Sequence, residues 1–326
     1  MSDRLGQSTV FPPSTGVRKG SRTSAIGRSR LKSYRWVTGY LLVAPPVLYL
    51  FALSIFPLIY TLRLSVMDQN QGTWVFVGLS NYATTLADPW FWADLLNSAE
   101  FTIPSVVLHL AIGLALAVMV NRVWFSISLR NLVRGLLILP WIFSTAAAAL
   151  IWSLMFHPFG IFNWIGLSIL HLPQAIDFLG TPGLAMASLV LVNTWKSYPF
   201  YMLAILGSLQ SIPIELYEAA KVDGANAWGQ FRFITLPQLR TILAAISTID
   251  IISTFGHVDL MKIMTQGGPF RSTETISYYV YQKGFGDGDL GNAAAISTLV
   301  LLALAIMAVV YLRTVFRSGE TDGTGF

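Results

Sequence analysis

Six long apolar stretches constrain the fold of this chain more than any other feature of its sequence. The hydrocarbon core of a bilayer is about 30 Å thick, and a helix needs ~20 apolar residues to cross it. Within lipid, a helix satisfies its backbone hydrogen bonds along a single segment. We therefore expect an all-α polytopic membrane protein with six transmembrane helices. The stretches cover residues 37–66, 101–120, 132–156, 184–209, 241–261 and 293–313.

Composition excludes several classes of function. The chain is 54% hydrophobic and 11% charged, values typical of multi-span membrane proteins. It has no cysteine, which rules out a disulfide framework and a thiolate metal site. The sequence contains no phosphate-binding loop, nucleophile elbow or HExxH zinc motif. We expect a non-catalytic chain without a metal or cofactor of its own, so any ATP and Mg²⁺ must bind to another subunit.

The distribution of Lys and Arg predicts the orientation of the chain. Basic residues gather in both tails, in the segment 121–134 and in the loop 210–240, whereas the connections 67–100 and 157–183 contain none. Only the segment 262–292 breaks this alternation. We therefore expect both termini and the 210–240 loop to lie in the cytoplasm. The net charge of +5 fits this sorting and anionic lipid, and it gives no signal for nucleic acid.

These patterns divide the chain into three parts. Residues 1–35 form a basic tail rich in Ser, Gly and Arg, which we expect to be disordered and cytoplasmic. Residues 36–315 form one six-span transmembrane domain that includes the 210–240 loop. Residues 316–326 form a short cytoplasmic tail.

The 210–240 loop carries the signals of two short helices. Pro213 and Glu215 follow Ser211 as in the first turn of a helix, and Gly224 suits the left-handed residue that ends one. We expect the aromatic residues after Gly224 to pack beneath the bundle; they are Trp228, Phe231 and Phe233. Taken alone, this pattern fits an ordinary amphipathic connector equally well.

The same loop resembles a known family. Residues 217–237 read YEAAKVDGANAWGQFRFITLP, which resembles the cytoplasmic EAA loop of permease subunits in binding-protein-dependent ABC importers. The resemblance implies that the first helix of the loop docks in a cleft of an ATPase subunit and transmits its closure. The residues that it assigns to ATPase coupling are Glu218, Ala219, Ala220, Asp223 and Gly224.

Further segments resemble the carbohydrate-type, maltose-transporter-like branch of these importers. They are Thr265–Pro269, Gly291–Ser297, Leu139-Pro140-Trp141 with Arg134, and Asn193 with Trp195 and Pro199. The likeness covers residues from about 36 to 315. It implies the type I ABC importer permease fold, a heterodimer with a second homologous permease, two ABC ATPase subunits and an extracytoplasmic solute-binding protein. It also implies a location in the inner (plasma) membrane of a bacterial cell. We expect Gly267, Gly268 and Pro269 to contact that binding protein, the alternative being a plain outer turn.

Polar residues inside the apolar stretches predict the path of a solute. Asn193, Ser197 and Phe200 share one helix face, and Asp250, Thr254 and His257 repeat that spacing in the next span. Two such faces would offer a sugar hydrogen-bonding groups and an aromatic wall. The maltose-type family similarly contacts its polyol from these two spans, but this chain lacks the paired Asn of the fifth span.

Structural roles are the alternative for each of these residues. Asn193 and Thr254 suit interhelical hydrogen bonds, Lys196 and Asp250 suit an ion pair, and His257 suits a wetted helix end.

The leading hypothesis is a permease subunit that forms, with a second permease, the path of a sugar through an ATP-driven importer. Alternatives are a permease for a polyol phosphate such as glycerol-3-phosphate, or an ion-coupled secondary transporter that uses Asp250. An intramembrane enzyme built on Ser253 and His257, at i and i+4, is a weaker alternative.

Overall fold

The computed structural model describes residues 40–70, 72–121 and 127–321. The predicted tail of residues 1–35 lies outside these ranges. The chain divides into two compact units, residues 1–58 and 59–326. The described part of the first unit is helical, with a π-helical turn at Phe51–Ile55, and all of its residues are exposed. Exposed apolar residues on a long helix suit contact with lipid or with another chain.

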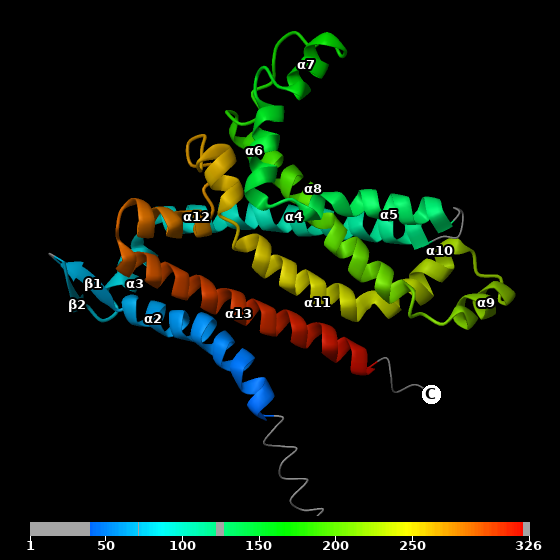
Figure 1. Cartoon of the computed structure of the whole chain (residues 1–326), viewed down its shortest axis with the longest axis horizontal. Coiled ribbons are helices and arrows are strands. Elements are labelled where there is room, and N and C mark those ends of the chain that lie inside the picture. The colour runs from blue at the N-terminus through cyan, green and yellow to red at the C-terminus, as the bar shows by residue number, and fades with distance from the viewer. Residues whose placement is uncertain (1–39, 71, 122–126, 322–326) are drawn as a thin grey trace, which may run out of the picture. The chain divides into compact units, whose positions relative to one another are not determined.

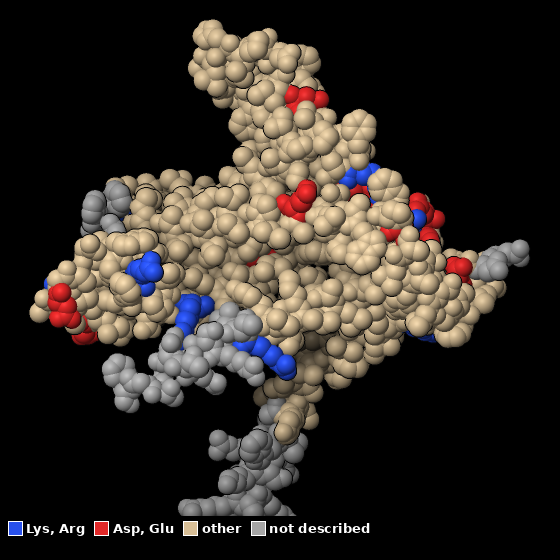
Figure 2. All heavy atoms as spheres, turned by 180° about the vertical axis from the view of Figure 1, so that it is seen from behind, with Lys and Arg blue, Asp and Glu red and all other residues tan. Residues whose placement is uncertain are grey.

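Within the described ranges, four helices are long and apolar enough to cross a membrane. A fifth candidate is formed by α8 (Pro182–Leu209) and α9 (Ile214–Val222), which are bent by 72° at their junction. Figure 2 shows a face with few charged side chains along the helices, as a membrane protein requires. The four single spans are Tyr40–Leu64, Pro89–Asn121, Thr145–Ser168 and Leu290–Arg313.

The second unit is a bundle of long helices with one small hairpin (Figure 1). Helix α2 (Phe56–Leu64) continues into it from the first unit. Its strands are β1 (Met67–Asn70) and β2 (Thr73–Phe76), antiparallel with Met67 opposite Phe76. The α-helices that follow are α3 (Ser80–Ala87), α4 (Pro89–Asn121), α5 (Ile127–Ile142), α6 (Thr145–Phe156), α7 (Ile161–Ser168), α8, α9, α10 (Ala227–Gln230), α11 (Leu236–Phe255), α12 (Ile276–Tyr281) and α13 (Leu290–Thr321). Three π-helical turns lie among them, at Phe231–Thr235 (η2), Met261–Thr265 (η3) and Gln282–Gly286 (η4).

Helices α4 and α8 form the centre of the bundle because a glycine lets them approach closely. A Cβ added to Gly113 would lie 2.4 Å from the Cβ of Tyr201 and 3.0 Å from the backbone nitrogen of Met202. Around this crossing, Ala117, Tyr201, Met202 and Ile205 are fully buried or nearly so. The contact fixes the height of α4 against α8, and therefore the height of their polar residues.

The small residues at the start of α13 likewise allow a close approach, here between the helix and the backbone of the hairpin. A Cβ on Gly291 would lie 2.4 Å from the carbonyl oxygen of Met67. Asn81 Nδ2 donates to that same oxygen at 2.9 Å. The segment Gly291–Ser297 therefore begins a helix whose first turn packs directly on the hairpin backbone.

Three expected spans differ from the structure. The stretch 132–156 is divided into α5 and α6, because Ser144 caps a new helix: its hydroxyl accepts the Ala147 backbone N–H at 3.2 Å. The stretch 241–261 forms α11, which ends at Phe255 with Gly256 as its cap. Helix α13 continues past the expected end at 313 as far as Thr321.

Candidate functional site

The two short helices of the 210–240 loop lie where the sequence predicts, although the Ser211 hydroxyl does not cap the first of them: it donates to the Ser208 carbonyl at 2.8 Å. Helix α9 follows Pro213, carries Glu215 in its first turn and contains no buried residue. It ends at Gly224, whose φ is +81°. The Ala225 N–H donates to the Ala220 carbonyl at 2.8 Å, and the Gly224 N–H donates to the Lys221 carbonyl at 3.1 Å. This pair of bonds is the Schellman ending, which needs a left-handed residue and therefore favours glycine.

The second half of the loop ties α9 to the start of α11. Asn226 caps α10 by accepting the Gly229 N–H at 2.8 Å, and η2 then runs straight into α11. The hydroxyl of Tyr217, in α9, lies 3.0 Å from the hydroxyl of Thr235. This contact bonds α9 to η2, the segment that leads directly into α11.

The expected burial of the loop aromatics is wrong for two of the three. Trp228 and Phe233 are 65% and 75% exposed. Trp228 stacks on Phe231, at 5.6 Å between ring centroids, and does not reach the bundle. Glu218 and Ala219 are exposed as well. The loop therefore presents both of these residues to solvent together with the rings of Trp228 and Phe233.

At the centre of the bundle, one carboxylate joins three helices. Asp250 of α11 accepts from the Tyr201 hydroxyl at 3.1 Å and from the Thr254 hydroxyl at 3.1 Å. His109 of α4 places its Nδ1 2.8 Å from Asp250 Oδ2. Each of these four residues is at most 8% exposed. The cluster holds α4, α8 and α11 together through polar contacts in an apolar setting.

His109 and Tyr201 were not predicted as members of this cluster. The alternative pairing of Lys196 with Asp250 is wrong for the residues that the structure describes, because the carboxylate pairs with His109 there. The available signal was His109 itself: a titratable side chain inside a long apolar helix must face protein or water.

The remaining predicted solute contacts lie around the cluster. Asn193 is fully buried, and neither of its amide atoms has a hydrogen-bond partner among the described residues. Ser197 and Phe200 are half-buried, and the Phe200 ring lies 6.4 Å from that of Trp141. His257 lies in the turn beyond α11, so it does not extend the helix face of Asp250 and Thr254.

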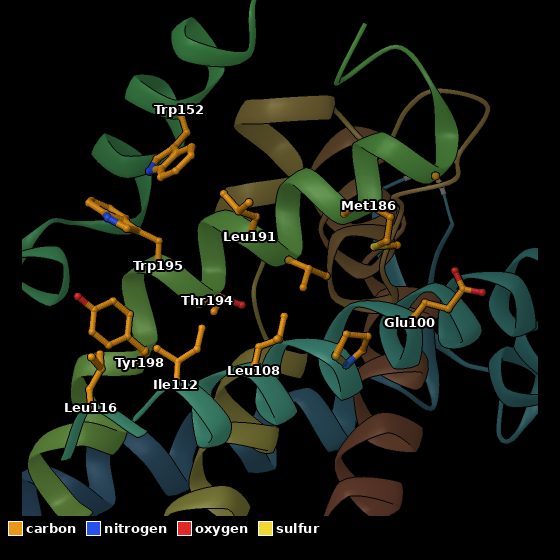
Figure 3. Close-up of a pocket in the computed structure, with 14 residues that line it drawn as sticks. Glu100, Leu108, Ile112, Leu116, Trp152, Met186, Leu191, Thr194, Trp195 and Tyr198 are labelled. Atoms are coloured by element: carbon orange, nitrogen blue, oxygen red, sulfur yellow. The ribbon is translucent and has the colours of Figure 1, made fainter. Parts of the chain in front are cut away.

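An open apolar groove of about 820 Å³ runs beside this centre, between α4, α6 and α8 (Figure 3). Leu108, Ile112 and Leu116 line it from α4, opposite Leu191 of α8. Glu100 is an exposed acid in its lining. Where α6 crosses, Trp152 meets Trp195 edge to face, with 5.6 Å between ring centroids. So large an apolar surface suits an apolar partner chain.

At the other end of α11, the segment 265–275 forms a tightly bonded loop. The Thr265 and Thr273 hydroxyls lie 2.7 Å apart, and Thr273 donates to the Gly268 carbonyl at 2.7 Å. A Cβ on Gly267 would lie 3.0 Å from the ring of Tyr278. Burial raises the pKa of the Glu274 carboxyl above its ordinary value, and the Arg271 guanidinium opposes that shift. The predicted turn is therefore present, as part of a larger bonded structure.

Comparison with known proteins places these features in a family. Residues 109–318 match the family described as binding-protein-dependent transport system inner membrane component. The chain belongs to this family. As a member, it is a multi-pass membrane permease, and the matched region runs from His109 through the 210–240 loop into α13. Membership does not favour the secondary transporter. Helix α11 ends before His257, so Ser253 and His257 do not share the helix face that the enzyme alternative requires.

Individual relatives of the permease are named for sugar transport. It is 34% identical to the trehalose/maltose transport system permease protein MalF of Thermococcus litoralis, over 87% of this chain and 96% of that protein. It is 31% identical to the lactose transport system permease protein LacF of Rhizobium radiobacter, over 87% of this chain and 96% of that protein.

A solved structure confirms the fold of the permease. A chain of a bacterial ABC transporter that imports the acidic polysaccharide alginate matches with a TM-score of 0.77 and 22% identity. The match covers 89% of this chain and 99% of that chain. The permease therefore has the type I ABC importer permease fold that the sequence predicts.

Proposed function

We propose that this permease forms, with a second homologous permease, the membrane path of an ATP-driven sugar importer. Its relatives are named for trehalose, maltose and lactose, and the structural match comes from an importer of alginate. These solutes are all carbohydrates. The observation that carries the proposal is α9, a short helix without a buried residue, bent by 72° from α8.

Helix α9 serves as the coupling element. Two separate ATPase subunits bind ATP and Mg²⁺, and this chain supplies the surface that they move. The exposed Glu218 faces a basic group of the ATPase, while Ala219 and Ala220 let its backbone approach closely. Asp223 and Gly224 end the helix, and this ending fixes the direction in which the chain leaves α9. Closure of the ATPase pair then moves α8 and α11 as rigid bodies.

The proposed contact of α9 with the ATPase subunits implies the orientation of the chain in the membrane. Helix α11 has 20 residues and is therefore about 30 Å long, so its length matches a bilayer core although its composition alone does not place it among the apolar spans. Helix α9 and both termini lie on the cytoplasmic side. The loop at the other end of α11 then lies outside, where the partly exposed Gly268 and Pro269 are available to a solute-binding protein, whereas Gly267 is buried against Tyr278 and shapes the turn from within.

The solute crosses between α8, α11 and the second permease. Asn193, Ser197 and Phe200 supply contacts from α8, and Asp250, Thr254 and His257 supply them from α11 and the turn that follows it. The buried amide of Asn193 and the bonded carboxylate of Asp250 become available when the helices separate. The second permease covers the apolar groove between α4 and α8, which would otherwise face lipid.

Uptake of labelled sugar into vesicles that contain the complete assembly tests this function. Glu218→Lys should abolish uptake, because it reverses the charge presented to the ATPase. Glu215→Lys, in the first turn of the same exposed helix, is the matched control and should retain uptake. Normal uptake with Glu218→Lys, or uptake without ATPase subunits, would contradict the proposal.

A further inference from the structure

The outer loop presents one large apolar side chain to solvent. Phe270 is 93% exposed, although the residues on either side of it are bonded to the protein. Its φ is +51°, and the φ of the following Arg271 is +61°. Two consecutive non-glycine residues in the left-handed region are uncommon, and such strain persists where the surroundings impose it. The backbone is therefore held in a shape that directs this aromatic ring outward.

Arg271 provides much of that constraint. Its guanidinium lies 2.9 Å from Asp94 of α4 and 2.7 Å from Glu274. It also lies over the Trp90 ring, 4.1 Å from the centroid. Asn97 of α4 donates to the carbonyls of both Arg271 and Glu274 at 3.0 Å. These contacts fasten the loop to α4, so Phe270 projects from a rigid support.

We propose that Phe270 is an aromatic anchor by which the solute-binding protein docks on this permease. The inference rests on the proposed function, which places this loop outside the membrane. Aromatic side chains dominate binding energy when a partner encloses them, and a rigid support lowers the entropy lost on docking. A partner with an apolar pocket surrounded by polar groups fits this loop.

The surroundings of the ring favour a water-soluble partner over lipid. Arg271, whose side chain is one-third exposed, follows it in the chain, and Lys283 of η4 lies 3.4 Å from Asp287, the exposed residue that caps the end of η4. Hydrocarbon chains would leave these charges without water. The second permease has a separate apolar surface, the groove between α4, α6 and α8. The binding protein, on which this family depends, is the remaining partner at the outer end.

The test measures stimulation of ATPase activity in proteoliposomes by the purified solute-binding protein encoded beside the transporter. Phe270→Ala should raise the half-saturating concentration of binding protein about tenfold, the effect of losing an enclosed aromatic contact, and leave the maximal rate unchanged. Phe270→Tyr keeps the ring and should behave as the unmodified chain. Phe159→Ala removes a phenylalanine that is 92% exposed between α6 and α7, and it should have no effect.

The outcomes separate this inference from the proposed function. Stimulation of the unmodified assembly together with an unchanged half-saturating concentration for Phe270→Ala overturns the docking role alone. Absence of any stimulation of the unmodified assembly overturns both. A photoreactive phenylalanine analogue at position 270 should crosslink to the added binding protein, and crosslinking only to the second permease or to lipid would overturn the docking role.

Discussion

His109 Nδ1 lies 2.8 Å from Asp250 Oδ2, and this contact joins α4 to α11 inside the bundle. Tyr201 of α8 donates to the same oxygen, so that three helices meet at one carboxylate. A buried charge is costly unless its hydrogen-bonding capacity is filled. Asp250 satisfies that condition with partners from three elements, and α11 itself supplies Thr254 for the second oxygen. The cluster therefore fixes how these helices pack against one another.

Asp250→Ala should lower the free energy of unfolding by about 3–5 kcal/mol, because it leaves His109 and Tyr201 buried without their partner. His109→Ala should destabilise for the same reason. The double variant should lose clearly less free energy of unfolding than the two single variants lose together, because Asp250 and His109 share one interaction. Denaturation of the purified assembly in detergent measures all three values.

Thr248→Ala is the control for this cycle. Thr248 is a buried residue of the same helix, but its hydroxyl bonds to the Ala244 carbonyl of its own helix. Thr248→Ala should lower the free energy of unfolding by about 1 kcal/mol, and this loss should add to the loss caused by His109→Ala. Simple additivity of Asp250→Ala and His109→Ala would show that the two side chains are not coupled.

The cluster shows which part of the site the sequence could predict. The sequence predicts Asp250 as a polar contact on the same helix face as Thr254, and the structure places it there, buried and bonded. Its partner was not identified, because the height of α4 against α11 depends on contacts between helices. The crossing of Gly113 with Tyr201 sets part of that height, and no local pattern encodes it.

Gly113→Ala should destabilise the bundle by about 1–3 kcal/mol, because the added methyl group overpacks the crossing of α4 and α8. The nearest atoms belong to the Tyr201 Cβ and to the backbone of Met202, which have little freedom to move. Gly207→Ala is the matched control, since a Cβ at that position of α8 meets no atom within 4 Å. It should be neutral or stabilise by up to about 1 kcal/mol. Equal thermal shifts for the two variants would refute the close crossing.

Gly224→Ala should reduce sugar uptake by disturbing the end of α9. The φ of +81° costs a residue with a Cβ about 1–2 kcal/mol, although no atom would clash with that Cβ. Gly224→Asn should retain more uptake, because asparagine tolerates the left-handed conformation better. Uptake is compared at equal amounts of assembly in the membrane. Greater uptake with alanine than with asparagine would show that the conformation of this residue is not the determining factor.

The 210–240 loop was predictable because its signals are local. The helix start at Pro213 and its end at Gly224 depend on residues within two turns of each position, and both agree with the structure. The burial of Trp228 and Phe233 was not predictable in the same way, because it depends on what lies beneath the loop. The same limit applies to the outer loop, where the sequence indicates a Gly-Gly-Pro turn but not its attachment to Asp94 and Asn97.

Arg271→Ala should release the outer loop from α4. Asp94 is fully buried and would lose its cation, but the Arg271 side chain is one-third exposed, so the loss of stability should fall below the value of about 3–5 kcal/mol for a fully buried pair. Alanine and arginine at position 271 share the same left-handed backbone strain. The measured loss of stability therefore reports on the contacts of the side chain. Arg271→Lys should give an intermediate loss, because lysine keeps the charge but cannot contact two carboxylates and stack on Trp90 in the same way.

Hydrogen exchange of residues 265–275 measures this release directly. Faster exchange in Arg271→Ala, with unchanged exchange in α9, is the expected pattern, since the two segments lie at opposite ends of α11. Lys262→Ala is the control: its exposed ammonium contacts the Tyr281 hydroxyl and ring, and solvent screens such contacts. If Lys262→Ala accelerated exchange as much as Arg271→Ala, the attachment of the loop would depend on general charge and not on the pairing of Arg271 with Asp94.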